Sequence, residues 1–176
     1  AEGLSPQEVF AVLNRIFSAF DELAEKHGLE KIKTIGDAYM VAGGLNDGAR
    51  DYTRAMADLA LAMRDLLRDD REVNDMHLDV RIGIGTGPVV AGVVGKKKFI
   101  YDLWGDTVNI ASRITSEGTP GMVHVDETTR RRLAGRFEFL DPLVIHLKGK
   151  GDTVVHRLAG PVAKVTPAVP AGAGGA

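Results

Sequence analysis

The residues best placed to do chemistry lie in one stretch, residues 99–113. It begins with strand character that ends on Asp102, and a segment with helical spacing, residues 106–114, follows. On a helix, Asn109 and Arg113 lie four positions apart and project from one face. A carboxylate, an amide and a guanidinium in this order suit a phosphorylated polar ligand. From spacing alone, a solvated surface helix is an equal alternative.

A second polar position lies in a predicted tight hairpin. The short runs Glu30–Ile35 and Ala38–Ala42 are joined by Gly-Asp, a turn typical of such hairpins. Asp37 is therefore expected at an exposed tip, with Lys33 four residues upstream. Turn geometry alone is the commoner reason for an aspartate at such a position.

A third polar segment is the Lys-Gly-Lys-Gly run that begins at Lys148. Two lysines that alternate with glycines predict a flexible cationic loop, which can approach phosphate closely. As a lone motif it is weak, because exposed Lys-Gly turns are common. Gly83, Gly85 and Gly87 also invite a nucleotide-loop interpretation, but their spacing is not G-x-G-x-x-G, so we reject it.

The remaining pattern predicts the elements that position these residues. Helical spacing runs from a capping box at residues 5–8 to Gly28, and again over residues 49–68. Residues 70–76 are expected to form a polar loop, and alternation over residues 78–84 predicts a half-buried strand. The element order indicates an α+β fold, a mainly antiparallel sheet with helices largely on one face. A short helix is expected at residues 126–133. Further strands are expected at residues 88–94, 98–102, 122–125, 137–140, 144–147 and 153–158.

Composition limits the class of protein. The chain has 176 residues, 44% hydrophobic and 26% charged, with a net charge of −2. This predicts one globular domain, residues 1–159, and a disordered Pro/Ala/Gly tail, residues 160–176. No nucleic acid partner is expected. The absence of cysteine excludes disulfides and a cysteine nucleophile. No apolar run approaches the roughly 20 residues of a membrane span, so we expect no membrane contact within this chain and a cytoplasmic location.

Four stretches, in order, resemble the class III nucleotidyl cyclase catalytic domain. They are residues 30–40, residues 81–94 with Gly-x-Gly-x-Gly-Pro-Val-Val-Ala-Gly, residues 101–113 and residues 147–151. Together they span nearly the whole chain to about residue 158, and the chain is identified as a member of this family. The resemblance implies a ferredoxin-like α+β fold and a head-to-tail homodimer with active sites at its interface. It also implies that strands 88–94 and 98–102 form an extended hairpin that contacts the partner subunit.

The resemblance implies a role for each candidate residue. Lys33 and Asp102 match the pair that recognises the base, and Asn109 matches the residue that orients the ribose. Arg113 matches the arginine of the transition state, and Lys148 the lysine that contacts the terminal phosphates. An ammonium and a carboxylate suit adenine, so the expected reaction is conversion of ATP to cyclic AMP.

The resemblance also implies a two-metal site that holds Mg²⁺ or Mn²⁺, and Asp37 matches one of its two aspartates. The other belongs to a Phe-x-Asp-x-x-Gly-Phe segment in a strand before the first helix, and no such segment precedes Ser5. We therefore expect the first strand to be missing from the sequence as given. A non-catalytic cyclase-homology module, which dimerises or binds nucleotide, is the alternative function. A guanylyl cyclase is a weaker third possibility.

Overall fold

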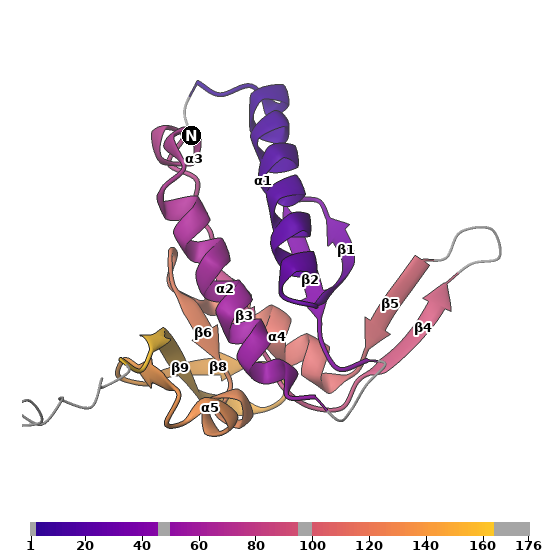
Figure 1. Ribbon diagram of the computed structural model, residues 1–176, viewed down its shortest axis with the longest axis vertical. Helices are drawn as coiled ribbons and strands as arrows, with labels where there is room; N and C mark the ends of the chain where they lie inside the picture. The colour runs from indigo at the N-terminus through magenta and orange to yellow at the C-terminus, as the bar shows by residue number, and fades with distance from the viewer. Residues whose placement is uncertain (1–2, 46–49, 95–99, 164–176) are drawn as a thin grey trace, which may run out of the picture.

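The three-dimensional structure is a computed structural model that describes residues 3–45, 50–94 and 100–163. Helices are interspersed with runs of one to three strands along the chain, in an α+β order (Figure 1). The elements are α1 (Pro6–Lys26), β1 (Glu30–Ile35), β2 (Ala38–Ala42), α2 (Tyr52–Arg68), α3 (Arg71–Asp75), β3 (Ile82–Ile84), β4 (Val90–Val94), β5 (Ile100–Trp104), α4 (Asp106–Glu117), β6 (Val123–Val125), α5 (Glu127–Leu133), β7 (Phe137–Phe139), β8 (Leu143–Leu147) and β9 (Gly151–Pro161). Within the described ranges, none of the helices is long and apolar enough to cross a membrane.

Helix α1 begins as the capping box predicts. The Ser5 hydroxyl accepts a hydrogen bond from the backbone N of Glu8 at 3.2 Å, and the proline that follows has no N–H to leave unpaired. The buried residues of α1 recur once per turn and are Val12, Ile16, Phe20 and Ala24. They join Leu59 and Met63 of α2 in one hydrophobic cluster, so the two long helices pack together.

The larger sheet has the strand order β3-β6-β9-β7, and β8 also pairs with β9. β3 and β6 are parallel, whereas β6, β7 and β8 all run antiparallel to β9. β6 is buried along its whole length, and a second hydrophobic cluster joins this sheet to α2 and α5. The predicted α+β fold with a mainly antiparallel sheet is confirmed.

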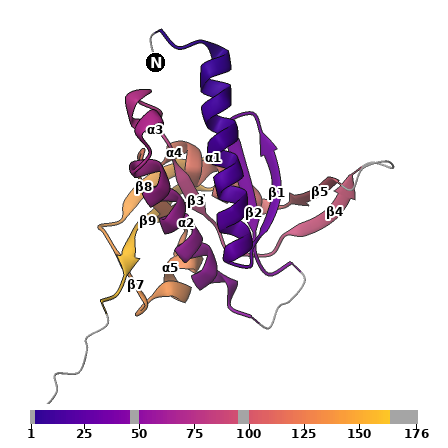
Figure 2. The ribbon, with the colours of Figure 1, turned by 45° about the horizontal axis from the view of Figure 1, so that its top comes forward.

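Strands β1 and β2 form a separate two-stranded sheet beside α1 (Figure 2). The Tyr39 hydroxyl donates to the Asp21 carboxylate of α1 at 2.7 Å, and the Lys31 ammonium lies 3.1 Å from the same carboxylate. The Tyr39 ring lies 5.4 Å from the rings of Phe17 and Phe20, measured between centroids. Burial, together with the bond to Asp21, raises the pKa of Tyr39, so its hydroxyl stays a donor. Contacts with α1 therefore position this hairpin.

Strands β4 and β5 form an antiparallel ribbon that projects from the body of the molecule (Figures 1 and 2). The predicted lysine-rich tip, residues 95–99, lies outside the described residues. At the base of the ribbon, Val90 pairs with Trp104, and these side chains are 65% and 43% exposed. This apolar pair is therefore open to solvent where the ribbon leaves the body of the molecule.

Three predictions of local structure differ from the structure. The strand predicted over residues 78–84 is shorter, and β3 covers only Ile82–Ile84. Residues 70–76 contain the short helix α3, because the Asp70 carboxylate accepts a hydrogen bond from the backbone N of Val73 at 3.0 Å and caps the helix. Asp102 lies within a strand and not at its end, because β5 continues to Trp104 with β4 as its partner.

The expected start of the tail also differs from the structure. Strand β9 continues to Pro161, which pairs with Phe137, so residues 160 and 161 still belong to the sheet. Residues 164–176 lie outside the described part of the chain.

Asp70 also ties α3 to α1, and this contact predicts a pH dependence of stability. Its two oxygens accept hydrogen bonds from the Arg15 guanidinium at 2.6 and 2.9 Å. These bonds, with that from the Val73 backbone, lower the pKa of Asp70 to about 2. A carboxyl whose folded pKa is depressed stabilises the fold above its unfolded pKa, about 3.9. We expect Asp70→Asn to lower the free energy of unfolding by about 1 kcal/mol at pH 7, since Arg15 is half-exposed.

Urea unfolding of both proteins from pH 7 to pH 3 measures this effect. Asparagine still caps a helix, so the difference reports the ion pair. The difference should decline below about pH 4 and fall to about half by pH 3, as the carboxyl becomes protonated. Asp65→Asn, at an exposed carboxylate beside Arg64, is the control and should change little. A difference that stays constant with pH would contradict the ion-pair explanation.

Candidate active site

Helix α4 lies directly against β3 because glycines leave no side chain between them. A Cβ on Gly83 would lie 2.3 Å from Thr115 Oγ1 and 2.8 Å from the backbone N of Thr115. A Cβ on Gly87 would lie 2.5 Å from Thr107 Oγ1. Gly85, between them, faces the same helix. The glycines rejected above as a nucleotide loop therefore form the surface on which α4 packs.

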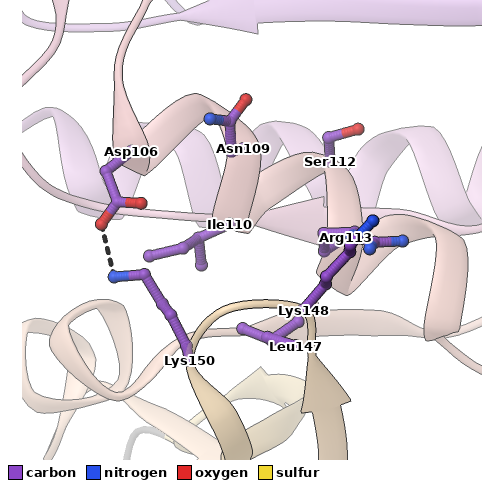
Figure 3. A pocket seen from close by; sticks show the side chains of 8 residues that line it. All are labelled: Asp106, Asn109, Ile110, Ser112, Arg113, Leu147, Lys148 and Lys150. Atoms are coloured by element: carbon purple, nitrogen blue, oxygen red, sulfur yellow. Dashed lines mark hydrogen bonds and ion pairs between the residues drawn. The ribbon is translucent and has the colours of Figure 1, made fainter.

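An open pocket of about 300 Å³ lies between α4 and the turn that joins β8 to β9 (Figure 3). It is lined by Asp106, Asn109, Ile110, Ser112, Arg113, Leu147, Lys148 and Lys150. The structure therefore brings three predicted site residues, Asn109, Arg113 and Lys148, into one pocket. Its volume is at the lower end of the range for small-molecule sites, about 300–1,000 Å³.

The pocket has an excess of positive charge. Arg113 and Lys148 are exposed, and in the described part of the chain neither forms an ion pair. Lys150, in contrast, binds Asp106 at the start of α4 (Figure 3). The two free cations and the Asn109 amide are donors available to a ligand with phosphate oxygens.

A second pair of predicted site residues meets where β1 approaches β5. Lys33 Nζ lies 2.8 Å from Asp102 Oδ2, although the two residues are 69 positions apart. Asp102 Oδ1 accepts a hydrogen bond from the backbone N of Leu103 at 2.8 Å. The hydrogen bond from Lys33, and then that from Leu103, hold the pKa of Asp102 below its ordinary value. The carboxylate therefore stays ionised and acts only as an acceptor.

A β-bulge aims Lys33 at Asp102. The register of β1 against β2 shifts between Lys31 and Lys33, so Ile32 is an extra residue. In a regular strand, residues two positions apart point to the same face. Here Lys31 binds Asp21 of α1, whereas Lys33 binds Asp102 of β5. The bulge thus directs Lys31 and Lys33 to different partners, whereas in a regular strand both side chains would point to the same face.

Asp37 is not among the residues that line the α4 pocket. It is exposed in the turn between β1 and β2, next to Gly36 with a φ of +58°. A carboxylate oxygen is a hard ligand that suits Mg²⁺ or Mn²⁺, so Asp37 fits a metal ligand by its chemistry. Among the described residues, no three His, Asp or Glu side chains gather in one place. Within these residues, a metal at Asp37 would need further oxygen ligands, such as those of phosphates.

Two charged residues of the pocket were missed by the sequence analysis. Asp106 and Lys150 are these residues, and the sequence places them only in the helical segment 106–114 and in the Lys-Gly loop. The alternation of the two lysines was the only available signal, because the partner of Lys150 lies 44 positions away in the sequence.

Comparison with known families matches residues 1–160 to the adenylate and guanylate cyclase catalytic domain. The chain belongs to this family. The cyclase domain is 43% identical over 151 residues to an adenylate cyclase of Mycobacterium tuberculosis, which covers 86% of this chain and 34% of that protein. The chain thus spans about a third of the length of that relative.

Solved structures agree with this assignment. The guanylate cyclase domain of a protein from Catenaria anguillulae, in complex with GTP, has a TM-score of 0.83 and 30% identity, and the match covers 92% of this chain and 89% of that one. A guanylyl cyclase domain from Blastocladiella emersonii, described as a non-canonical dimer, has a TM-score of 0.80 and 29% identity, and the match covers 93% of this chain and 87% of that one. The predicted cyclase fold is confirmed, and relatives of both base specificities are found.

Proposed function

We propose that the cyclase domain converts ATP to 3′,5′-cyclic AMP and pyrophosphate. The observation that carries this proposal is the Lys33–Asp102 pair, an ammonium 2.8 Å from an ionised carboxylate. Asp102 lies on β5, and the pocket residues Asn109 and Arg113 lie on α4, the next element in the chain. Asp102, which would recognise the base, is therefore close in sequence to Asn109 and Arg113, which suit ribose and phosphate.

The hydrogen-bonding pattern of the pair favours adenine over guanine. Adenine has an amino group at position 6 and an acceptor at N1. The Asp102 carboxylate accepts from the amino group, and the Lys33 ammonium donates to N1. Guanine presents a carbonyl oxygen and an N–H at the corresponding positions. The carboxylate would then face an acceptor and the ammonium a donor, which leaves polar groups unpaired.

The remaining side chains suit the chemistry of cyclisation. The ribose 3′-oxygen attacks the α-phosphorus in line, the hydroxyl proton is released, and pyrophosphate leaves with the electrons of the broken P–O bond. The Arg113 guanidinium would donate to the α-phosphate oxygens as their charge increases. Asn109 would orient the ribose and Lys148 would bind the terminal phosphates. The reaction requires no side-chain nucleophile.

Asp37 would hold Mg²⁺ or Mn²⁺ against the phosphates. Such an ion, when bound, neutralises phosphate charge and lowers the pKa of the 3′-hydroxyl. Since Asp37 is not among the residues that line the α4 pocket, we propose that Asp37 of one copy serves the pocket of a second copy. A homodimer would then hold two equivalent sites. The exposed Val90 and Trp104 support contact with a second copy.

The test is an assay of the purified protein with ATP and Mn²⁺. We expect cyclic AMP and pyrophosphate in equal amounts, a large decrease in both with Arg113→Ala, and loss of both on chelation of the metal. Light scattering reports whether the protein is a dimer under the same conditions. A folded dimer that binds ATP without forming product would contradict the proposal and favour a non-catalytic cyclase-homology module.

Exchange of the base-recognising pair should change the nucleotide preference. Lys33→Glu supplies acceptors for the N–H groups of guanine, and Asp102→Ser supplies a donor for its carbonyl. We expect the ratio of kcat/KM for ATP to that for GTP to fall by at least about 100-fold in the double variant. Initial rates with each nucleotide measure this ratio.

The neighbouring ion pair offers a matched control. Lys31→Glu with Asp21→Ser makes the same exchange in a pair that lies between β1 and α1. This control should leave the ATP-to-GTP ratio unchanged. Equal shifts in both double variants, or a native preference for GTP, would contradict base recognition by Lys33 and Asp102.

A further inference from the structure

Lys150 belongs to the same turn as Lys148 and lines the same pocket. The backbone N of Lys150 donates to the Leu147 carbonyl at 2.9 Å and closes the turn, and Gly149 and Gly151 adopt φ values of +85° and +75°. Leu147 is buried against the body of the domain, so the turn is anchored beside α4. From this turn, each flexible lysine side chain can reach a ligand in the pocket.

The pair between Lys150 and Asp106 is too exposed to be strong. Their side chains are 43% and 66% exposed, and ion pairs in contact with water contribute little to stability. A triphosphate has several negative charges, and charge-assisted hydrogen bonds from lysine to phosphate are stronger than bonds between neutral groups. A polyphosphate in this pocket would therefore compete successfully with one carboxylate for Lys150.

Helix α4, in addition to Lys150, stabilises the Asp106 carboxylate. Asp106 is the first residue of α4, a helix of 12 residues, and the positive end of the helix dipole stabilises a carboxylate there. While the pocket is empty, the Asp106 carboxylate offsets one of three neighbouring cations. If Lys150 were absent, the same carboxylate would repel phosphate.

We infer that Lys150 is a further phosphate-binding residue of the α4 pocket and that it exchanges Asp106 for phosphate oxygens when a triphosphate binds. The inference rests on the proposed function, since it assigns the polyphosphate of the substrate to this pocket. Asp106 then acts as an internal competitor that weakens the binding of substrate and of the pyrophosphate product.

Isothermal titration calorimetry with inorganic tripolyphosphate, without nucleotide, tests the exchange. Lys150→Met should weaken binding by about tenfold, because a cation is lost and the carboxylate is left unpaired. Asp106→Asn should tighten binding by about two- to fivefold, because Lys150 is released. The double variant should bind more tightly than Lys150→Met alone. Lys31→Met, which breaks the ion pair with Asp21 outside the pocket, should match the native protein.

The effect of Asp106→Asn decides between two roles of the pair. If the pair only braces the turn, both single variants and the double variant would weaken binding equally, which would overturn the inference. No binding of tripolyphosphate to the native protein would overturn it as well. The titration does not depend on turnover, so the predicted pattern in a protein that makes no cyclic AMP would contradict the proposed function and leave this inference intact.

Discussion

Replacement of Arg113 by alanine is expected to lower kcat for cyclic AMP formation by about 10²–10³-fold, the usual effect of removing one preorganised donor from developing charge. Arg113 is exposed in the α4 pocket, so its loss should disturb the fold little. Because the α-phosphate gains charge mainly in the transition state, KM for ATP should change much less than kcat.

Two further variants make this prediction specific. Arg113→Lys retains the charge but loses the planar fork of donors, so it should recover only part of the rate. Arg131→Ala removes an arginine of α5 that is 67% exposed and should leave the rate unchanged. An increase in KM alone, with kcat unaffected, would assign Arg113 to substrate binding and not to the transition state.

Gly83→Ala is expected to lower kcat by about 100-fold, because small displacements of catalytic groups have effects of this size. The added Cβ would lie 2.3 Å from Thr115 Oγ1 and 2.9 Å from the Ala111 carbonyl oxygen. The threonine side chain can move, but the backbone of α4 cannot move without displacing Asn109 and Arg113. Overpacking of this kind also lowers the free energy of unfolding by about 1–3 kcal/mol.

The matched control is Gly160→Ala in β9, where an added Cβ would meet no atom within 4 Å. It should leave both kcat and stability nearly unchanged. Adding Thr115→Ala to Gly83→Ala removes the closest contact but not the backbone contacts, so we expect partial recovery. Full activity of Gly83→Ala would show that α4 can withdraw from β3 without disturbing the site. Steady-state kinetics and urea unfolding measure the two effects.

Local patterns in the sequence determined the limits of several helices and strands and the family to which the chain belongs. The hairpin strands Glu30–Ile35 and Ala38–Ala42 have the predicted limits, because the Gly-Asp turn between them fixes where pairing begins. The start of α1 follows from the Ser5 cap. The family assignment also came from the sequence and is confirmed. Turns, caps and short motifs act through neighbouring residues, so they can be recognised without a structure.

The common face of Asn109 and Arg113 was determined by the sequence as well, because a helical spacing of four residues fixes it. Their roles in catalysis, and that of Lys148, remain predictions. The sequence analysis missed α3, because its five residues are too few for an apolar period to show.

The tertiary structure decided how distant residues meet, although the family resemblance had already paired Lys33 with Asp102. The bulge at Ile32 directs Lys33 to Asp102, and the packing of the β8–β9 turn on α4 brings Lys150 to Asp106. The role of Gly83 depends equally on the approach of α4 to β3. These contacts depend on how helices and strands pack against one another. That packing is determined by the free energy of folding of the whole hydrophobic core. No local pattern of residues contains this information.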